Sequence, residues 1–118
     1  MEQNWRKWTE KVQAFCEARD WDQYHGPKDL AIGLVTEATE LLEIFRFKND
    51  DQSKALLQHP KQREYVADEL ADTLFFLLRF AQRNDFDLGQ ALDQKMAKNA
   101  IRYPVEKAHG KNDKYDQL

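Results

Sequence analysis

The chain has 118 residues, with 18 lysine and arginine against 21 aspartate and glutamate residues, and its net charge of −3 argues against a nucleic-acid polymer as the main ligand. Its length suits one domain with a real core, and helix formers dominate, because there are only 4 glycines and 3 prolines. The lone Cys16, the lack of an apolar leader and the lack of a membrane-length apolar run predict a cytoplasmic protein that does not enter a membrane.

Helical spacing of the apolar residues predicts four helices and no strand. The expected ranges are about 5–19, 27–48, 62–83 and 88–102, with a loop at 49–53 and a short helical turn at 54–58. Asn4 and Asp87 are suitable N-caps, Pro27 suits a first helical turn, and Pro104 stops the last helix. We therefore expect an all-α fold, a four-helix bundle over residues 1–104, followed by a loose polar tail over 105–118.

The third predicted helix joins two carboxylates to an apolar segment. Glu69 and Asp72 are spaced i and i+3, so both side chains point the same way. Leu74–Leu78 follow, five large apolar residues that leave no face of a helix for water. We expect this helix to be central, covered by its own domain and by a second copy of the chain. Carboxylates beside it would be desolvated and would have to take up protons or hold cations.

The second predicted helix repeats this spacing with Glu37 and Glu40, which lie along the edge of an apolar stripe. If the two helices pack by their apolar stripes, four carboxylates converge in one place. Such a group of oxygen ligands suits a hard divalent cation, Mg²⁺ above all. The expected metal-binding and catalytic residues are Glu37, Glu40, Glu69 and Asp72.

The fourth predicted helix changes character along one stripe. The stripe starts apolar and continues as Lys95, Asn99 and Arg102, at i, i+4 and i+7. A cation, an amide and a guanidinium in place of apolar residues predict an anionic ligand at that end of the helix.

Several blocks of the chain resemble the MazG-like, all-α nucleoside triphosphate pyrophosphohydrolases, and among them the dCTP pyrophosphatases. These blocks are Glu37-x-x-Glu40 with Glu69-x-x-Asp72, Trp21-Asp22-Gln23-Tyr24-His25, Leu41–Phe47, Lys95-Met96-x-x-Asn99-x-x-Arg102-Tyr103-Pro104 and Lys114-Tyr115-x-x-Leu118. The resemblance spans roughly residues 12–118. It implies a homodimer or homotetramer that uses Mg²⁺ to convert a nucleoside triphosphate, dCTP or a modified dCTP, to monophosphate and pyrophosphate, and so cleans the nucleotide pool.

The resemblance also assigns residues to the substrate. Those implied to enclose the base are Trp21, His25, Phe47 and Phe76, and those implied to contact the triphosphate or sugar are Lys95, Asn99, Arg102 and Tyr103. Three positions depart from the pattern: Phe47 lies where dCTP pyrophosphatases tend to have Trp, Phe76 replaces a Tyr near the pocket, and Val12 lies where some relatives have His. All three departures concern recognition of the base, so they leave the base preference open.

Two other interpretations fit parts of this pattern. A helical dimerisation or adaptor module with a vestigial metal site is the alternative, because Leu74–Leu78 would serve it equally well. A di-iron bundle needs Glu-x-x-His on each of two helices, and the chain has this spacing only at Glu106 and His109, in the tail. The helix spacing alone does not distinguish attack at the α-phosphorus from attack at the γ-phosphorus.

Overall fold

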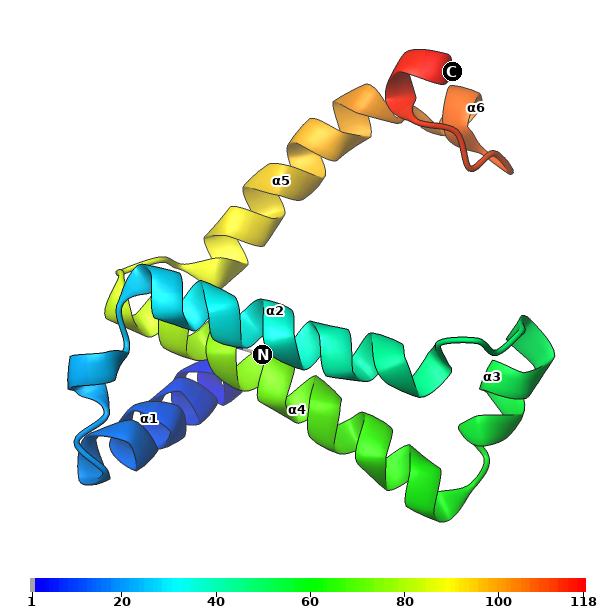
Figure 1. Cartoon of the computed structure of the whole chain (residues 1–118). Helices are drawn as coiled ribbons and strands as arrows, with labels where there is room; N and C mark the ends of the chain where they lie inside the picture. Colours follow the sequence, from blue (N-terminus) through cyan, green and yellow to red (C-terminus); the bar gives the residue numbers. More distant parts are fainter. Residues whose placement is uncertain (1) are drawn as a thin grey trace. The chain divides into compact units, whose positions relative to one another are not determined.

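The structure, a computed structural model, describes residues 2–118, with side chains from Asn4 onward, and its regular elements over that range are all helical (Figure 1). In chain order they are α1 (Glu2–Ala18), the 3₁₀ turn η1 (Asp22–Tyr24), α2 (Pro27–Phe45), α3 (Asp50–Leu56), α4 (Pro60–Arg83), α5 (Leu88–Arg102), α6 (Val105–Ala108) and the 3₁₀ turn η2 (Tyr115–Gln117). The predicted all-α class is confirmed. None of the helices in this range combines the length and apolar character that a membrane crossing needs.

The chain divides into two compact units between Asp85 and Phe86. The first unit contains α1 to α4, and the second contains α5, α6 and η2. Asp85 adopts the left-handed region with φ of 59°, which aspartate tolerates better than most residues. The boundary expected at residue 104 and the four-helix bundle stay predictions.

Within the first unit, α2 lies alongside α4, and α1 packs against α4 (Figure 1). Gly33 of α2 lies directly against Phe76 of α4. A Cβ atom placed on Gly33 would lie 2.3 Å from Cε1 of Phe76, so the phenyl ring occupies the space that any side chain would need. This glycine is therefore required by packing, and Phe76 lies between the two helices.

The core of the described residues is small. Its buried apolar side chains are Cys16, Leu30, Val66, Leu78 and Ala81. On α4, Leu77 within the apolar run keeps 39% of its surface exposed, and Leu70, one turn before the run, keeps 53%. A single chain therefore does not cover this helix on every side, and its covering by a second copy stays a prediction.

The second predicted helix and the loop after it differ from expectation. Helix α2 ends at Phe45, and Phe47 lies in the left-handed region with φ of 67°. Residues 50–56, expected as a loop and a turn, form one helix because Asn49 and Gln52 make a capping box. The Asn49 side chain accepts from the Gln52 N–H at 2.8 Å, and the Gln52 side chain accepts from the Asn49 N–H at 2.9 Å.

The tail, expected to be loose, is folded onto the end of α5. The ring of Tyr115 lies 6.1 Å from that of Tyr103, and the Arg102 guanidinium lies 4.9 Å above the Tyr115 ring. The prediction failed because composition marked the tail as polar, whereas one aromatic residue within it is enough to make these contacts.

Candidate active site

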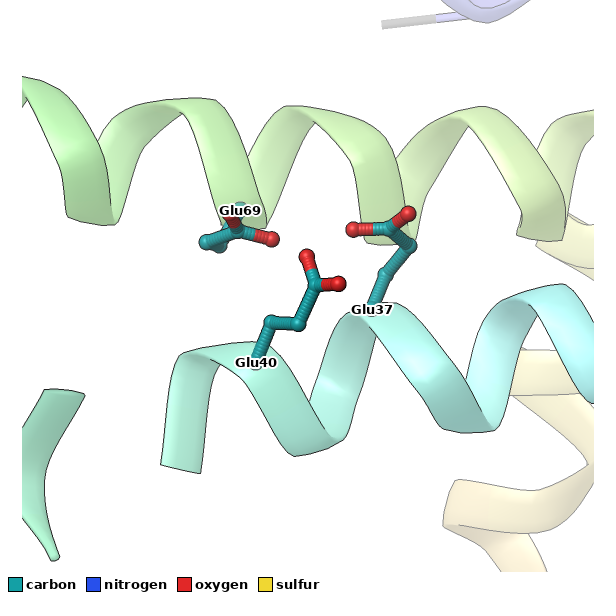
Figure 2. A group of neighbouring side chains, drawn as sticks. All are labelled: Glu37, Glu40 and Glu69. Atoms are coloured by element: carbon teal, nitrogen blue, oxygen red, sulfur yellow. The ribbon is translucent and has the colours of Figure 1, made fainter. Parts of the chain in front are cut away.

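Three of the four predicted carboxylates converge between α2 and α4. Glu37 and Glu40 come from α2 and Glu69 comes from α4, and Figure 2 shows the three side chains pointing toward one another. One oxygen from each carboxylate lies within 4.8 Å of the other two. Glu37 and Glu69 are half-buried and Glu40 is exposed, so the cluster opens to solvent on one side.

The helix register accounts for this convergence. Gly33 and Glu37 are one turn apart on α2, and Glu69 and Phe76 are two turns apart on α4, so each pair shares one face of its helix. Because Phe76 packs on Gly33, the same faces meet again at the glutamates. The packing of Phe76 on Gly33 therefore determines where the glutamates of the two helices meet.

Burial changes the protonation of the cluster. It raises the pKa of Glu37 to about 7, and the neighbouring carboxyl groups of Glu69 and Glu40 add to the effect. Burial also raises the pKa of Glu69. The Oε2 atoms of Glu37 and Glu69 are buried and have no hydrogen-bond partner among the described residues.

Buried acceptors without a donor cost roughly 1–3 kcal/mol each, and more when charged. A divalent cation would satisfy both oxygens and would remove the repulsion between the carboxylates. The donor set consists of carboxylate oxygens alone, which is the chemistry that Mg²⁺ prefers. The residues present therefore fit the predicted metal.

Asp72, the fourth predicted ligand, is exposed and lies outside this group of three. It lines an open groove between α1 and α4 together with Trp8 and Lys11. Its charge nevertheless raises the pKa of Glu37 and of Glu69. Asp72 is thus near enough to act on the cluster, and its role as a metal ligand stays a prediction.

The residues assigned to the base are not all brought together. Trp21 and His25 flank η1, with their ring centroids 6.1 Å apart. Phe47 lies beyond the other end of α2, is 91% exposed and has the Arg46 guanidinium 4.7 Å above its ring. Since a helix of 19 residues is about 28 Å long, one chain does not place Phe47 beside Trp21.

The residues assigned to the triphosphate or sugar all belong to the second unit. Lys95, Asn99 and Arg102 are on α5, and Tyr103 follows directly as its C-cap. Lys95, Arg102 and Tyr103 are exposed, while Asn99 is half-buried and accepts the backbone N–H of Tyr103 through its own carbonyl oxygen at 2.8 Å. Their contact with substrate stays a prediction.

The sequence pattern did not predict that an arginine would be buried beside the residues assigned to the base. Arg79 on α4 has no exposed surface, and its guanidinium donates hydrogen bonds to Asp22, His25 and Gln82. The available signal was its position directly after the apolar run of α4, because a cation there needs an anionic partner.

Comparison with known proteins identifies the family of the chain. Residues 32–118 match the MazG-like family. The chain belongs to this family. Over 104 residues this MazG-like chain is 40% identical to dCTP pyrophosphatase 1 of Mus musculus and 38% identical to dCTP pyrophosphatase 1 of Homo sapiens. Each match covers 88% of this chain and 61% of the relative, so the chain spans about three fifths of the length of these curated relatives.

A solved structure has the same architecture. A pyrophosphatase from Archaeoglobus fulgidus is 32% identical in sequence to this MazG-like chain and superposes on it with a TM-score of 0.79. The match covers 84% of this chain and 91% of that one. The resemblance seen in the sequence is thereby confirmed.

Proposed function

We propose that this MazG-like chain is a Mg²⁺-dependent nucleoside triphosphate pyrophosphohydrolase. Its substrate would be a deoxynucleoside triphosphate, dCTP or a modified dCTP, and its role the cleaning of the cytoplasmic nucleotide pool. The observation that carries the proposal is the convergence of Glu37, Glu40 and Glu69 with two buried oxygens that lack a partner among the described residues. The relatives named dCTP pyrophosphatase and pyrophosphatase support the substrate class and the reaction.

The cluster would act through placement and charge. Glu37, Glu40 and Glu69, with Asp72, would hold Mg²⁺, which when bound neutralises charge on the phosphate oxygens. Trp21 and His25 would hold the base, and Lys95 would bind the β- and γ-phosphates. Water would attack the α-phosphorus, a carboxylate would accept its proton, and the bond to the β-phosphate oxygen would break, releasing pyrophosphate.

The bond that breaks can be tested with ¹⁸O-labelled water. The chain is incubated with each deoxynucleoside triphosphate and Mg²⁺, and the products are analysed by mass spectrometry. We expect pyrophosphate and a monophosphate that carries the label, with dCTP or a modified dCTP turned over fastest. Orthophosphate with a diphosphate product would show attack at the γ-phosphorus. No turnover of any nucleotide would favour the dimerisation or adaptor module instead.

The assembly state is a second expectation. Leu70 and Leu77 are exposed, and Trp8, Val12 and Phe75 help to line an open groove of about 340 Å³. A second copy would cover such apolar side chains, which soluble monomers rarely expose in large patches. We expect a homodimer or homotetramer in multi-angle light scattering. A second copy would also be required if Phe47 and Trp21 contact one base. A stable and active monomer at micromolar concentration would contradict this expectation.

A further inference from the structure

Near its C-terminal end, α4 contains a positive charge with no access to water. Arg79 has an exposed fraction of 0%, and burying a guanidinium costs several kcal/mol unless its nitrogens are bonded. Every nitrogen is used. Nε donates to Nδ1 of His25 at 2.9 Å, Nη1 donates to Oε1 of Gln82 at 2.6 Å, and Nη2 donates to the carboxylate of Asp22. Because each of its three nitrogens donates a hydrogen bond, Arg79 is the centre of an ordered polar network.

The bond from Arg79 determines where the proton of His25 lies. An arginine side chain is always a donor, so Nδ1 of His25 must be the acceptor. A neutral imidazole has one donor and one acceptor nitrogen, which leaves the proton on Nε2. Burial and the charges of Arg79 and Arg83 also lower the pKa of His25, while Asp22 and Asp29 act in the opposite sense. His25 can therefore present only an Nε2–H donor to a ligand.

The same network fixes the loop in which His25 lies. Asp22, at the start of η1, accepts from Arg79, and its carboxylate lies 3.7 Å from Nη1 of Arg83. Nη2 of Arg83 donates to the backbone oxygen of Asp22 at 3.3 Å. Two arginines one turn apart on α4 thus hold one end of η1, and Arg79 holds His25 at the other. Trp21 lies between this network and Phe15, 5.5 Å from the Phe15 ring.

We propose that Arg79 is a positioning residue for substrate selection: it holds His25 as the Nε2–H tautomer, so that the base pocket offers a fixed hydrogen-bond donor. The preferred base would then present an acceptor at this point, a ring nitrogen or a carbonyl oxygen as in a pyrimidine. This inference rests on the proposed function, in which Trp21 and His25 bind the base.

The tautomer can be measured without any turnover. In ¹⁵N-labelled protein at pH 7.5, long-range ¹H–¹⁵N correlation spectra show which ring nitrogen carries the proton, and His59 and His109 serve as internal references. We expect His25 to be the Nε2–H tautomer in the wild type, to lose this single tautomer in Arg79→Met and to keep it in Arg83→Met. An Nδ1–H tautomer or an imidazolium in the wild type would overturn the proposal.

Kinetics test the consequence for substrate. We expect Arg79→Met to raise KM about 10-fold or more with a smaller change in kcat, because it removes the support of a binding contact and leaves the carboxylate cluster intact. If circular dichroism shows that Arg79→Met does not fold, two variants of His25 test the proposal instead. His25→Gln keeps a donor at the end of the side chain and should keep KM within a few fold, whereas His25→Leu should raise it about 10-fold.

The outcomes distinguish the positioning role of Arg79 from the proposed hydrolase function. Equal KM for His25→Gln and His25→Leu, or an unchanged KM in folded Arg79→Met, would overturn the positioning role and leave the hydrolase proposal standing. Absence of nucleotide hydrolysis in the wild type would overturn the proposed function, and with it the role of His25 in base binding, whatever the tautomer.

Discussion

Glu37→Gln should abolish turnover while the protein stays folded. The change removes one charged ligand from the carboxylate cluster, and a bound metal supplies several kcal/mol of charge stabilisation. At about 1.4 kcal/mol per tenfold in rate, we expect kcat to fall by roughly 10³-fold or more. Steady-state release of pyrophosphate measures the loss, and circular dichroism checks the fold. The matched control is Glu64→Gln, an exposed glutamate on α4, which should keep wild-type activity.

The same variant should make the metal-free protein more stable at alkaline pH. In the wild type the fold raises the pKa of Glu37 from 4.5 to about 7, so proton binding favours the folded chain. This contribution is complete below pH 4.5 and is lost as the pH rises through about 7. In chelator, the Tm of the wild type should therefore fall more steeply between pH 5 and pH 8 than that of Glu37→Gln.

Two results would contradict these expectations. Wild-type turnover in Glu37→Gln would exclude the cluster as the metal site. Parallel Tm curves for the two proteins across this pH range would show that Glu37 is not the group whose proton stabilises the fold. Comparing the two proteins cancels the contribution of titrating groups away from the carboxylate cluster, His25 among them, because they are present in both, whereas the change at Glu69 belongs to the same cluster effect.

Gly33→Ala should destabilise the first unit and weaken metal binding together. The added methyl group would lie 2.3 Å from the Phe76 ring, so α2 and α4 must move apart or the ring must turn. Overpacking of this kind costs about 1–3 kcal/mol, in spite of the roughly 1 kcal/mol by which alanine exceeds glycine in helix propensity. Thermal unfolding in chelator measures the stability, and calorimetric titration with Mg²⁺ measures the affinity.

The double variant Gly33→Ala with Phe76→Leu identifies the cause. A smaller side chain at position 76 should recover part of the loss, so the two effects should not add. Gly89→Ala is the matched control, because a Cβ there meets only Oδ1 of Asp87, at an ordinary 3.5 Å. A Gly33→Ala protein as stable as the wild type, with unchanged affinity for Mg²⁺, would show that this contact does not set the spacing of the helices.

The carboxylate cluster could be predicted from the sequence because its geometry is mostly local. An i, i+3 pair on a helix shares a face whatever the tertiary fold, and the apolar stripes indicated which faces of α2 and α4 would meet. Glu37, Glu40 and Glu69 were therefore brought together as expected. Asp72, three residues after Glu69, is exposed and lies outside this group of three, because an i, i+3 spacing fixes the face of a helix but not which side chains converge.

Other features could not be predicted in this way. Two partners of Arg79, His25 and Asp22, lie 54 and 57 positions earlier in the chain, and hydrophobic periodicity gives no information on pairing at that range. The position of Phe47 depends on where α2 ends, and a left-handed residue two positions beyond the helix does not follow from an apolar stripe. The helix over residues 50–56 was predictable, because Asn49 and Gln52 have the spacing of a capping box.

The division of the glutamates between two helices has a consequence in coordination chemistry. In the proposed metal site, Glu37 and Glu40 would form one arm of a chelate and Glu69 the other, and the packing of Phe76 on Gly33 would set the distance between the two arms. Mg²⁺ requires oxygen ligands at about 2.0–2.1 Å, whereas Ca²⁺ accepts about 2.3–2.6 Å. The choice between small and large cations would then be governed by an apolar contact one to two turns away from the ligands. A protein of this family could change its preferred ion through a single methyl group, without altering any carboxylate.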